Sequence, residues 1–337
     1  MGPHTIPLCV TLLFTSAAAS LSTARVEREA WVMGTRVRIN VESLSAEAAS
    51  QSSEQALSAI EDMDALLSTW REESGLSALN RAEVGRTTTA PNALLTLLHE
   101  VLAWSERTEG AFDPAIGPLI DAWGVRSQPR TPSEDELTDA MEASGSGAFA
   151  IDPTSGTVVR AKPHAWLDAG AFGKGAALRD VQTALTADGI QRALIDLGGQ
   201  VLALSDDAAG WSFEVAHPLR RNEPVIPLRL VNVSAATSGA SERPGHLLDP
   251  RNGRPATDWG SVTVVDPDPL VADILSTALY VMGPEDGLAW ALGEDAIAAL
   301  FLTVEGDRVS ARWTPSMARW LGPSPQSPHT QSARDVY

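Results

Sequence analysis

The sequence predicts an α+β fold, because strand-like and helix-like segments do not alternate as regularly as they do in a doubly wound sheet. Val37, Ile39 and Val41 alternate with polar residues, which is the period of a half-buried strand. Later strand candidates, several of which follow one another directly, are ALIDL, WSFEVA, PLRLVNVSA, SVTVVD and AALFLTV. We therefore expect mixed or antiparallel sheets packed against helices.

Apolar residues at helical spacing predict the helices. One helix runs through EQALSAIEDMDALLSTW, and a second begins near Asn92 and stops before Gly110. A third is expected from Ala176 to Ala187. The segment VADILSTALYVMG is almost entirely apolar, which predicts a buried helix between Val271 and Gly283.

A single catalytic domain is expected over residues 25–321, since no linker divides the stretch from 30 to 321. Residues 1–24 contain an apolar run followed by alanines, which predicts an export signal too short for a stable membrane span. Residues 322–337 are rich in Pro, Ser and Gln and are predicted to be a disordered tail. The only cysteine, Cys9, lies in the predicted signal. We expect export to the periplasm or cell surface, where the chain could associate with the membrane.

The charge balance limits the ligands. The chain has 43 acidic and 25 basic residues, a formal net charge of -18, which argues against binding to nucleic acid. An anionic ligand would need local help from backbone amides, a metal ion or a single placed cation. Lys162 and Lys174 are the only lysines, so almost all the basic residues are arginine.

Lys174 stands between two glycines in GKGAAL, next to the predicted third helix. Glycines let backbone amides approach a ligand closely, and a helix N-terminus adds partial positive charge, so an anion site is plausible here. The spacing is not that of a phosphate-binding Walker loop. A second glycine pair, Gly198 and Gly199, follows a strand and could be only a bulge or tight bend.

The apolar helix candidate carries Asp273, Ser276 and Thr277 at spacings that place all three on one face. A buried carboxylate needs a partner, because an unpaired charge in the interior is costly. A metal ion could be that partner, and carboxylate plus hydroxyl oxygen suits Mg²⁺ or Ca²⁺. An ion pair or a helix cap would satisfy the same carboxylate, and this segment alone does not decide between them.

Two other acidic positions allow both a functional and a structural interpretation. Asp113 precedes a proline in GAFDPAIG, so it could hold a polar ligand or form an Asx turn. His246 and Asp249 lie three residues apart in a polar cluster, where a carboxylate can orient a histidine as a base. A solvated surface turn would explain the same cluster.

Seven segments, taken in order, resemble the ApbE family of FAD:protein FMN transferases. They are VMGTRVRI, LLSTWREESGLSALN, GAFDPAIGPLIDAWG, LDAGAFGKGAALRD, ALIDLGGQV, TSGASERPGHLLDPRNGRP and SVTVVDPDPLVADILSTALYVMG. The likeness spans roughly residues 30–285. Each motif alone is weak evidence, but seven in the same order rarely arise by chance. The resemblance implies an ApbE-like, T-fold-like catalytic domain.

The resemblance also implies an activity and a set of site residues. Such enzymes use Mg²⁺ to split FAD and pass FMN to a Thr or Ser hydroxyl of an exported redox protein, forming a phosphoester and releasing AMP. The FAD contacts implied by position are Met33, Trp70, Ala111, Phe112, Asp113, Asp168, Lys174 and Leu247. The carbonyl of Ala171 and the side chains of Asp273 and Thr277 would bind Mg²⁺. His246 would act as base, with Asp249 orienting it or shaping the turn.

Two alternative functions use the same residues. The first is a Mg²⁺-dependent FAD pyrophosphatase, which would release free FMN and AMP. The second is a carrier that binds FAD without turnover. The sequence does not separate the transferase from the pyrophosphatase, because both need the same pocket, whereas the combination of Asp273, Thr277 and His246 disfavours a carrier.

Overall fold

A computed structural model describes residues 23–239, 245–294 and 296–322 of the chain. The predicted tail, apart from Gly322, and residues 1–22 of the predicted export signal lie outside this described part. None of the helices within it is both long and apolar enough to cross a membrane.

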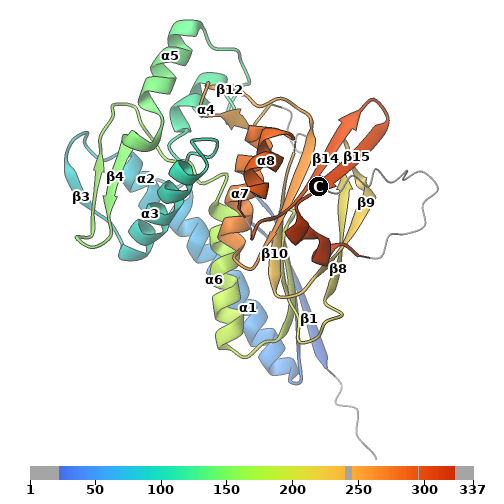
Figure 1. Ribbon diagram of the computed structural model, residues 1–337. Coiled ribbons are helices and arrows are strands. Elements are labelled where there is room, and N and C mark those ends of the chain that lie inside the picture. Colours follow the sequence, from blue (N-terminus) through green and yellow to red (C-terminus); the bar gives the residue numbers. More distant parts are fainter. Residues whose placement is uncertain (1–22, 240–244, 295, 323–337) are drawn as a thin grey trace, which may run out of the picture.

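An antiparallel sheet forms the centre of the described protein, and Figure 1 shows it flanked by helices on one side and by a hairpin on the other. Its strands, in spatial order, are β1 (Ala24–Val32), β2 (Thr35–Ser43), β6 (Arg192–Leu197), β7 (Gln200–Leu204), β10 (Val233–Gly239), β13 (Gly260–Asp266), β14 (Ala298–Glu305) and β15 (Arg308–Trp313). Each neighbouring pair runs antiparallel. The α+β prediction is confirmed.

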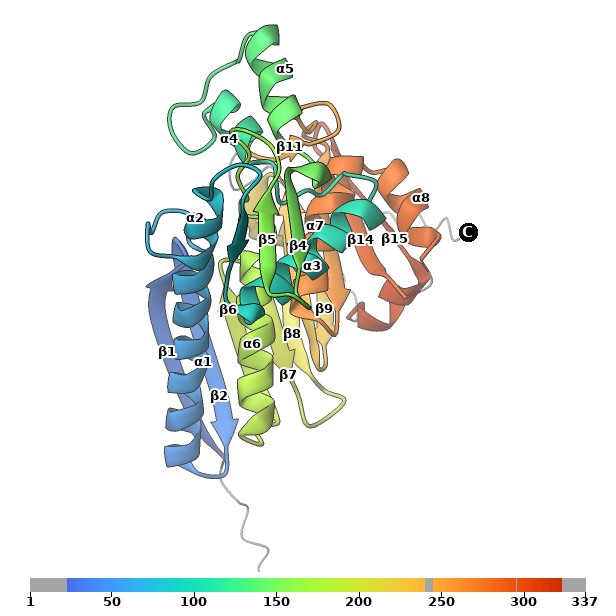
Figure 2. The ribbon, with the colours of Figure 1, turned by 90° about the vertical axis from the view of Figure 1, so that its left-hand side faces the viewer.

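Three long helices cover one face of the sheet: α1 (Ala46–Leu67), α6 (Gly173–Ala187) and α7 (Pro269–Met282). Figure 2 shows α1 and α6 lying side by side along the strands. The hairpin of β8 (Trp211–His217) and β9 (Arg220–Leu230) covers the opposite face. In β10, Ala235 packs with the hairpin and Ala236 packs with α7. The central strands are therefore buried on both faces, which explains their continuous apolar runs.

A second layer of smaller elements lies beside the helical face. It holds a three-stranded sheet in the order β3-β5-β4 and four helices (Figure 1). The elements are α2 (Gly75–Asn80), β3 (Thr87–Thr89), α3 (Asn92–Arg107), α4 (Gly117–Trp123), α5 (Glu134–Ala143), η1 (Ser146–Ala148), β4 (Phe149–Asp152) and β5 (Thr157–Arg160). The remaining elements are β11 (Leu248–Asp249), β12 (Arg254–Pro255), α8 (Asp286–Leu292) and η2 (Pro315–Trp320).

Several elements differ from the sequence predictions. Helix α6 begins at Gly173 and not at Ala176, so both glycines and Lys174 lie in its first turn. The predicted strand PLRLVNVSA is divided between β9 and β10 at Asn232, whose φ is 53°. The edge strand β1 was not predicted, because its alternating charged residues bury little surface, and it begins at Ala24, the last residue of the predicted signal.

Gly175 sets how closely α6 approaches α7. A Cβ atom on this residue would lie 2.6 Å from the Pro269 carbonyl oxygen and 2.8 Å from the Leu270 Cα. Both atoms belong to the backbone of α7, so neither can move without shifting the helix. Glycine is therefore required here for helix packing, and not only for the approach of a ligand.

We predict that Gly175→Ala lowers the free energy of unfolding by about 1–3 kcal/mol, the usual cost of overpacking a dense core. Gly173→Ala is the matched control, since its added Cβ would meet the flexible end of Met33 at 3.3 Å. The control should change stability by less than about 0.5 kcal/mol. Equilibrium urea unfolding of both variants measures the difference. Equal stability of the two variants would contradict the packing role of Gly175.

Candidate active site

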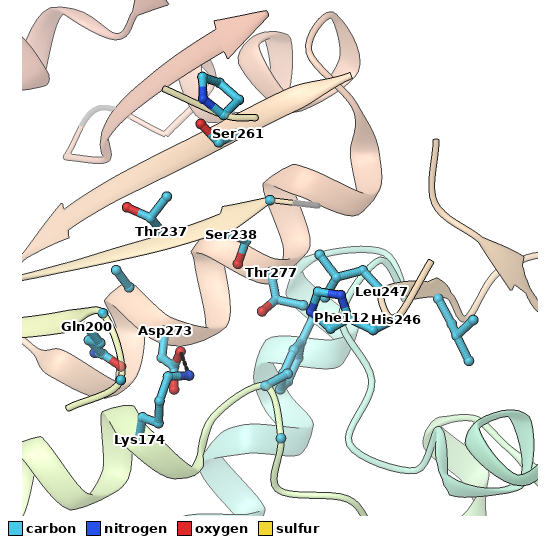
Figure 3. A pocket seen from close by; sticks show the side chains of 18 of the residues that line it. Phe112, Lys174, Gln200, Thr237, Ser238, His246, Leu247, Ser261, Asp273 and Thr277 are labelled. Atoms are coloured by element: carbon cyan, nitrogen blue, oxygen red, sulfur yellow. Dashed lines mark hydrogen bonds and ion pairs between the residues drawn. The ribbon is translucent and has the colours of Figure 1, made fainter. Parts of the chain in front are cut away.

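A cavity of about 620 Å³ opens at one end of the large sheet, where the first turn of α6, the middle of α7 and strands β7, β8 and β10 meet. Eleven of the predicted site residues line it: Met33, Ala111, Phe112, Asp113, Asp168, Ala171, Lys174, His246, Leu247, Asp273 and Thr277. Figure 3 shows Lys174 and Asp273 on one side of the cavity and Phe112, His246 and Leu247 on another. Segments far apart in the sequence therefore meet at this one cavity.

Asp273 is held at the cavity wall by two contacts. Its side chain is buried, and one carboxylate oxygen lies 3.0 Å from Lys174 Nζ. The other oxygen accepts a hydrogen bond of 2.9 Å from the Gly175 amide. This amide is one of the free N–H groups of the first turn of α6, so Asp273 caps the helix from outside its own segment. The anion at this N-terminus is thus the protein's own carboxylate.

Two further residues that could offer oxygen ligands to a hard metal ion, Ala171 and Thr277, line the cavity with Asp273. Thr277 lies one helical turn further along α7, with its hydroxyl on the side of Asp273 (Figure 3). Ala171 precedes α6 and lines the same cavity. Ser276 is not available in the same way, because its Oγ bonds to the Asp273 carbonyl and lies 2.9 Å from Ser238 Oγ. Carboxylate, hydroxyl and carbonyl oxygen fit Mg²⁺.

No group of three or more His, Cys, Asp or Glu side chains in the described ranges could hold a metal. A metal ion in the cavity would therefore depend on the neutral oxygen atoms beside Asp273. Such a mixed oxygen set agrees with Mg²⁺, which usually takes one or two carboxylates and fills its other positions with substrate phosphate or water.

Asp113 forms an Asx turn. Its Oδ1 accepts a 2.7 Å hydrogen bond from the Ala115 amide, and its Oδ2 accepts one of 3.1 Å from the Ser105 hydroxyl. Burial raises the pKa of Asp113 above its usual value, although both hydrogen bonds oppose that shift. The structural interpretation of this acid is therefore correct, and the residue also lines the cavity.

Asp168 lines the same cavity and is buried. One oxygen accepts a hydrogen bond of 2.8 Å from the Gly170 amide, and the other pairs with the Arg126 guanidinium. Burial raises the pKa of Asp168, while the charge of Arg126 acts in the opposite direction. In this structure the carboxylate is engaged by the protein itself.

Trp70 does not line the cavity that holds the other predicted contacts. It lies 74% exposed at a neighbouring hollow of about 520 Å³. Arg126 lines both spaces, with its guanidinium 5.2 Å from the Trp70 ring and 5.0 Å from the Trp166 ring. Arg126 therefore lies between Trp70 and residues of the main cavity such as Asp168, with which it pairs. Nothing in the sequence around Arg126 indicated this position.

His246 and Asp249 have different surroundings, and the turn at residues 250–253 follows Asp249. His246 is half-buried and lines the cavity. Asp249 instead binds Arg251 through both oxygens at 2.9 Å and accepts a hydrogen bond of 3.0 Å from Asn252. Asp249 therefore shapes the turn, which is the second of its two expected roles, and does not line the cavity.

Cavity residues that follow the glycine pair were not predicted from the sequence. Gly198 and Gly199 have φ values of 57° and 90°, so they form the tight turn between β6 and β7. The turn places Gln200 in the cavity wall, where its amide donates to the Pro269 carbonyl at 2.8 Å. The glycine pair was the available signal, but a bend alone does not indicate which side chain it presents.

Comparison with known proteins agrees with this geometry. The model of the ApbE family matches residues 33–301, most of the chain. The chain belongs to the ApbE family. A Klebsiella pneumoniae protein named FAD:protein FMN transferase is 28% identical over 324 residues, covering 91% of this chain and 92% of that one. A Rhodobacter capsulatus protein of the same name is 33% identical over 68% of this chain and 46% of its own.

Solved structures of ApbE proteins have the same fold. The flavin transferase ApbE from Vibrio cholerae superposes with a TM-score of 0.80 at 25% identity, covering 89% of this chain and all of that one. The apo flavinyl transferase ApbE from Pseudomonas stutzeri gives a TM-score of 0.79 at 27% identity, covering 90% and 98%. The ApbE fold therefore extends over nearly all of the described residues.

We predict that Asp113→Asn stabilises the protein at pH 7, and that the gain disappears as the pH falls. The amide keeps an acceptor for Ala115 and offers a donor to Ser105, while it removes a buried charge. Because the folded-state pKa of Asp113 is raised, the folded wild-type protein takes up a proton first as the pH falls, and it is thereby stabilised.

Asp152→Asn is the control, and its expected effect on stability at pH 7 has the opposite sign. Hydrogen bonds led by those from Ser155 lower the pKa of the exposed Asp152 carboxyl. Its stabilising effect is present at neutral pH and is lost as the pH falls through its folded-state pKa. Urea unfolding of both variants at pH 7 and pH 4 tests the pair. If Asp113→Asn is less stable than the wild type at pH 7, the predicted stabilisation is contradicted.

Proposed function

We propose that this chain is a transferase that moves FMN from FAD to a hydroxyl group of an acceptor protein. The observation that carries the proposal is the buried Asp273 carboxylate, held by Lys174 beside further oxygen ligands in a large cavity. The names of the ApbE relatives as FAD:protein FMN transferases support the same reaction. An acidic protein gains little from its overall charge in binding FAD, so the phosphates need this local arrangement.

Different residues around the cavity would bind different parts of FAD. Met33, Ala111 and Phe112 offer apolar surface to the ring systems, and Leu247 adds to it. Lys174 is the cation nearest the first turn of α6, where the pyrophosphate would lie. Lys174 already contacts Asp273, and a bound diphosphate would be a second anionic partner for the same ammonium.

Asp273, Thr277 and the Ala171 carbonyl are the residues that would hold Mg²⁺. When bound, the metal would neutralise charge on the non-bridging phosphate oxygens. Asp273 is fixed from two directions by Lys174 and the Gly175 amide, so its position is set before any ligand arrives. Such preorganisation reduces the cost of ordering the site during the reaction.

His246 is the proposed general base. The acceptor hydroxyl has a high pKa, so its proton must pass to a group within hydrogen-bond reach, here the imidazole. The hydroxyl oxygen attacks the phosphorus on the FMN side of the pyrophosphate. The bond from that phosphorus to the bridging oxygen breaks, and the bridging oxygen leaves with AMP. The products are a phosphoester of FMN with the acceptor, and AMP.

The acceptor would be an exported electron-transfer protein carrying a reactive Thr or Ser. This part of the proposal rests on the predicted export signal and on the family resemblance. We therefore propose that the enzyme and its acceptor meet in the periplasm or at the cell surface.

The direct test incubates the protein with FAD, Mg²⁺ and exported redox proteins encoded beside its gene. We expect one acceptor to gain the mass of an FMN group on a Thr or Ser, with release of one AMP for each group added. Intact-protein mass spectrometry and chromatography of the nucleotides measure the two products. Release of FMN and AMP without an adduct would indicate a pyrophosphatase, and FAD that stays intact would indicate a carrier.

Asp273→Asn is the matched variant for this test. The amide retains an oxygen for the Gly175 N–H and removes the charge that would hold Mg²⁺. We expect FMN transfer to fall by about 100-fold or more, as with loss of one preorganised electrostatic contact. Unfolding in urea should confirm that the variant is folded. Full activity at limiting Mg²⁺ would contradict the assignment of Asp273 as a ligand.

A further inference from the structure

The neighbouring hollow of about 520 Å³ has no role in the proposed reaction. It is formed in the smaller layer by α2, α4, the residues that follow α1 and the chain at the end of β5. Arg126 lines both the hollow and the cavity, so the two spaces adjoin. The other charged and aromatic residues that line the hollow are Trp70, Arg81, Asp121, Arg160, His164 and Trp166.

Two arginines of the hollow carry charges that no described carboxylate pairs. Most arginines in the described part of the chain form an ion pair with Asp or Glu. Arg81 instead donates to the Glu72 carbonyl and Arg160 to the Asn80 carbonyl, and neither forms an ion pair with a described residue. Arg81 is exposed and Arg160 is half-buried. Since a guanidinium has five N–H donors, the exposed Arg81 keeps donors and charge for a ligand.

The charge of the hollow is opposite to that of the whole protein. Asp121 is the carboxylate that lines it, and this group accepts a 2.9 Å hydrogen bond from Trp166 Nε1. Asp168, which lines the cavity, pairs with Arg126. Three guanidinium groups beside two carboxylates leave a local positive charge in a chain whose formal net charge is -18. The hollow therefore favours an acidic ligand.

Trp70 gives the same hollow an exposed aromatic surface. The Arg126 guanidinium lies against the rings of both Trp70 and Trp166. It also contacts Thr69 and Asp168, so it is held in place before any ligand binds. Trp and Arg are enriched among the residues that dominate the binding energy of protein–protein interfaces. Their combination at an accessible hollow fits a protein partner better than a small anion.

We propose that the hollow binds an acidic segment of the acceptor protein, in which a carboxylate bonds to Arg81 and an apolar side chain packs on Trp70. This inference rests on the proposed transferase function and assigns to its protein substrate a site outside the FAD cavity. Because the two spaces share Arg126, a segment held in the hollow would bring its neighbouring Thr or Ser to the adjoining cavity.

The charge is tested by Arg81→Gln, with Arg308→Gln as the matched control. Both arginines are exposed and neither forms an ion pair with a described residue, but Arg308 lies in β15 and does not line the hollow. The probe is the acceptor protein that the wild-type chain labels with FMN. At low salt we expect Arg81→Gln to raise the KM for this acceptor about fivefold, and Arg308→Gln to change it less than about twofold. Added NaCl should reduce the difference between Arg81→Gln and the wild type.

The aromatic surface is tested by Trp70→Ala, with Trp31→Ala as its control. Trp31 is 75% exposed on the edge strand β1, so the two variants remove equally accessible rings. We expect Trp70→Ala to raise the acceptor KM about tenfold, and Trp31→Ala to leave it within about twofold of the wild-type value. The Kd for FAD, measured by flavin fluorescence, should stay within about twofold in both variants. A weakened Kd for FAD in Trp70→Ala would show that the hollow holds part of FAD, and would overturn the inference.

A double-mutant cycle identifies the carboxylate. Each Asp or Glu that flanks the labelled residue of the acceptor is changed to the corresponding amide, and each product is assayed with the wild-type chain and with Arg81→Gln. For at least one acid, the change should raise KM with the wild-type chain and have little effect with Arg81→Gln, because the two groups share one contact. Additive effects for every acid overturn the proposed ion pair.

Urea unfolding first shows that all four variants of this chain are folded. An unchanged acceptor KM in either Arg81→Gln or Trp70→Ala then overturns the inference. If the wild-type chain labels no protein, the proposed function fails and this inference falls with it. Normal labelling by the wild-type chain with an unchanged KM in these variants removes only this inference.

Discussion

The Asp273 carboxylate is buried where the first turn of α6 meets α7, and the arrangement of the cavity depends on how its charge is compensated. Lys174 supplies an opposite charge at 3.0 Å, and the Gly175 amide supplies a hydrogen bond at 2.9 Å. Loss of either partner would leave a poorly compensated charge in the interior, which is strongly destabilising. The same carboxylate therefore serves to join two helices and to fix a charged group at the cavity.

Close packing makes this compensation possible. Gly175 allows the α6 backbone to approach Pro269 and Leu270, and only this approach brings the amide within reach of Asp273. A lysine suits the position better than an arginine would, because a compact ammonium needs less space than a planar guanidinium. In a chain whose basic residues are otherwise almost all arginine, Lys174 places a compact ammonium 3.0 Å from the Asp273 carboxylate.

Much of the fold and of the site could be predicted from the sequence, and what could not be predicted has a physical cause. The strong apolar periods of α1, α3 and α7 specify helices, and the β-branched runs of β13 and β14 specify strands. Asp273 could be recognised as a carboxylate that needs a partner. Its partner could not be chosen, because Lys174 is 99 residues away and only the packing of α6 on α7 brings them together.

The same limit applies to the remaining site residues. Most of the FAD contacts predicted from the motifs line one cavity. Trp70 lines a neighbouring hollow instead, and Arg126 lines both spaces. Asp249 was paired with His246 by sequence spacing, whereas its carboxylate turns toward Arg251. Local sequence indicates residue chemistry, and long-range packing decides which groups meet.

The most direct test of the proposed centre is diffraction from crystals of the protein grown with FAD and Mn²⁺, recorded at the manganese absorption edge. Mn²⁺ accepts the same oxygen ligands as Mg²⁺ and can be located by its anomalous signal. We predict a peak within about 2.0–2.3 Å of an Asp273 carboxylate oxygen, the Thr277 hydroxyl and the Ala171 carbonyl. A peak elsewhere, with Asp273 bonded only to Lys174 and the Gly175 amide, would contradict a metal centre at the helix junction.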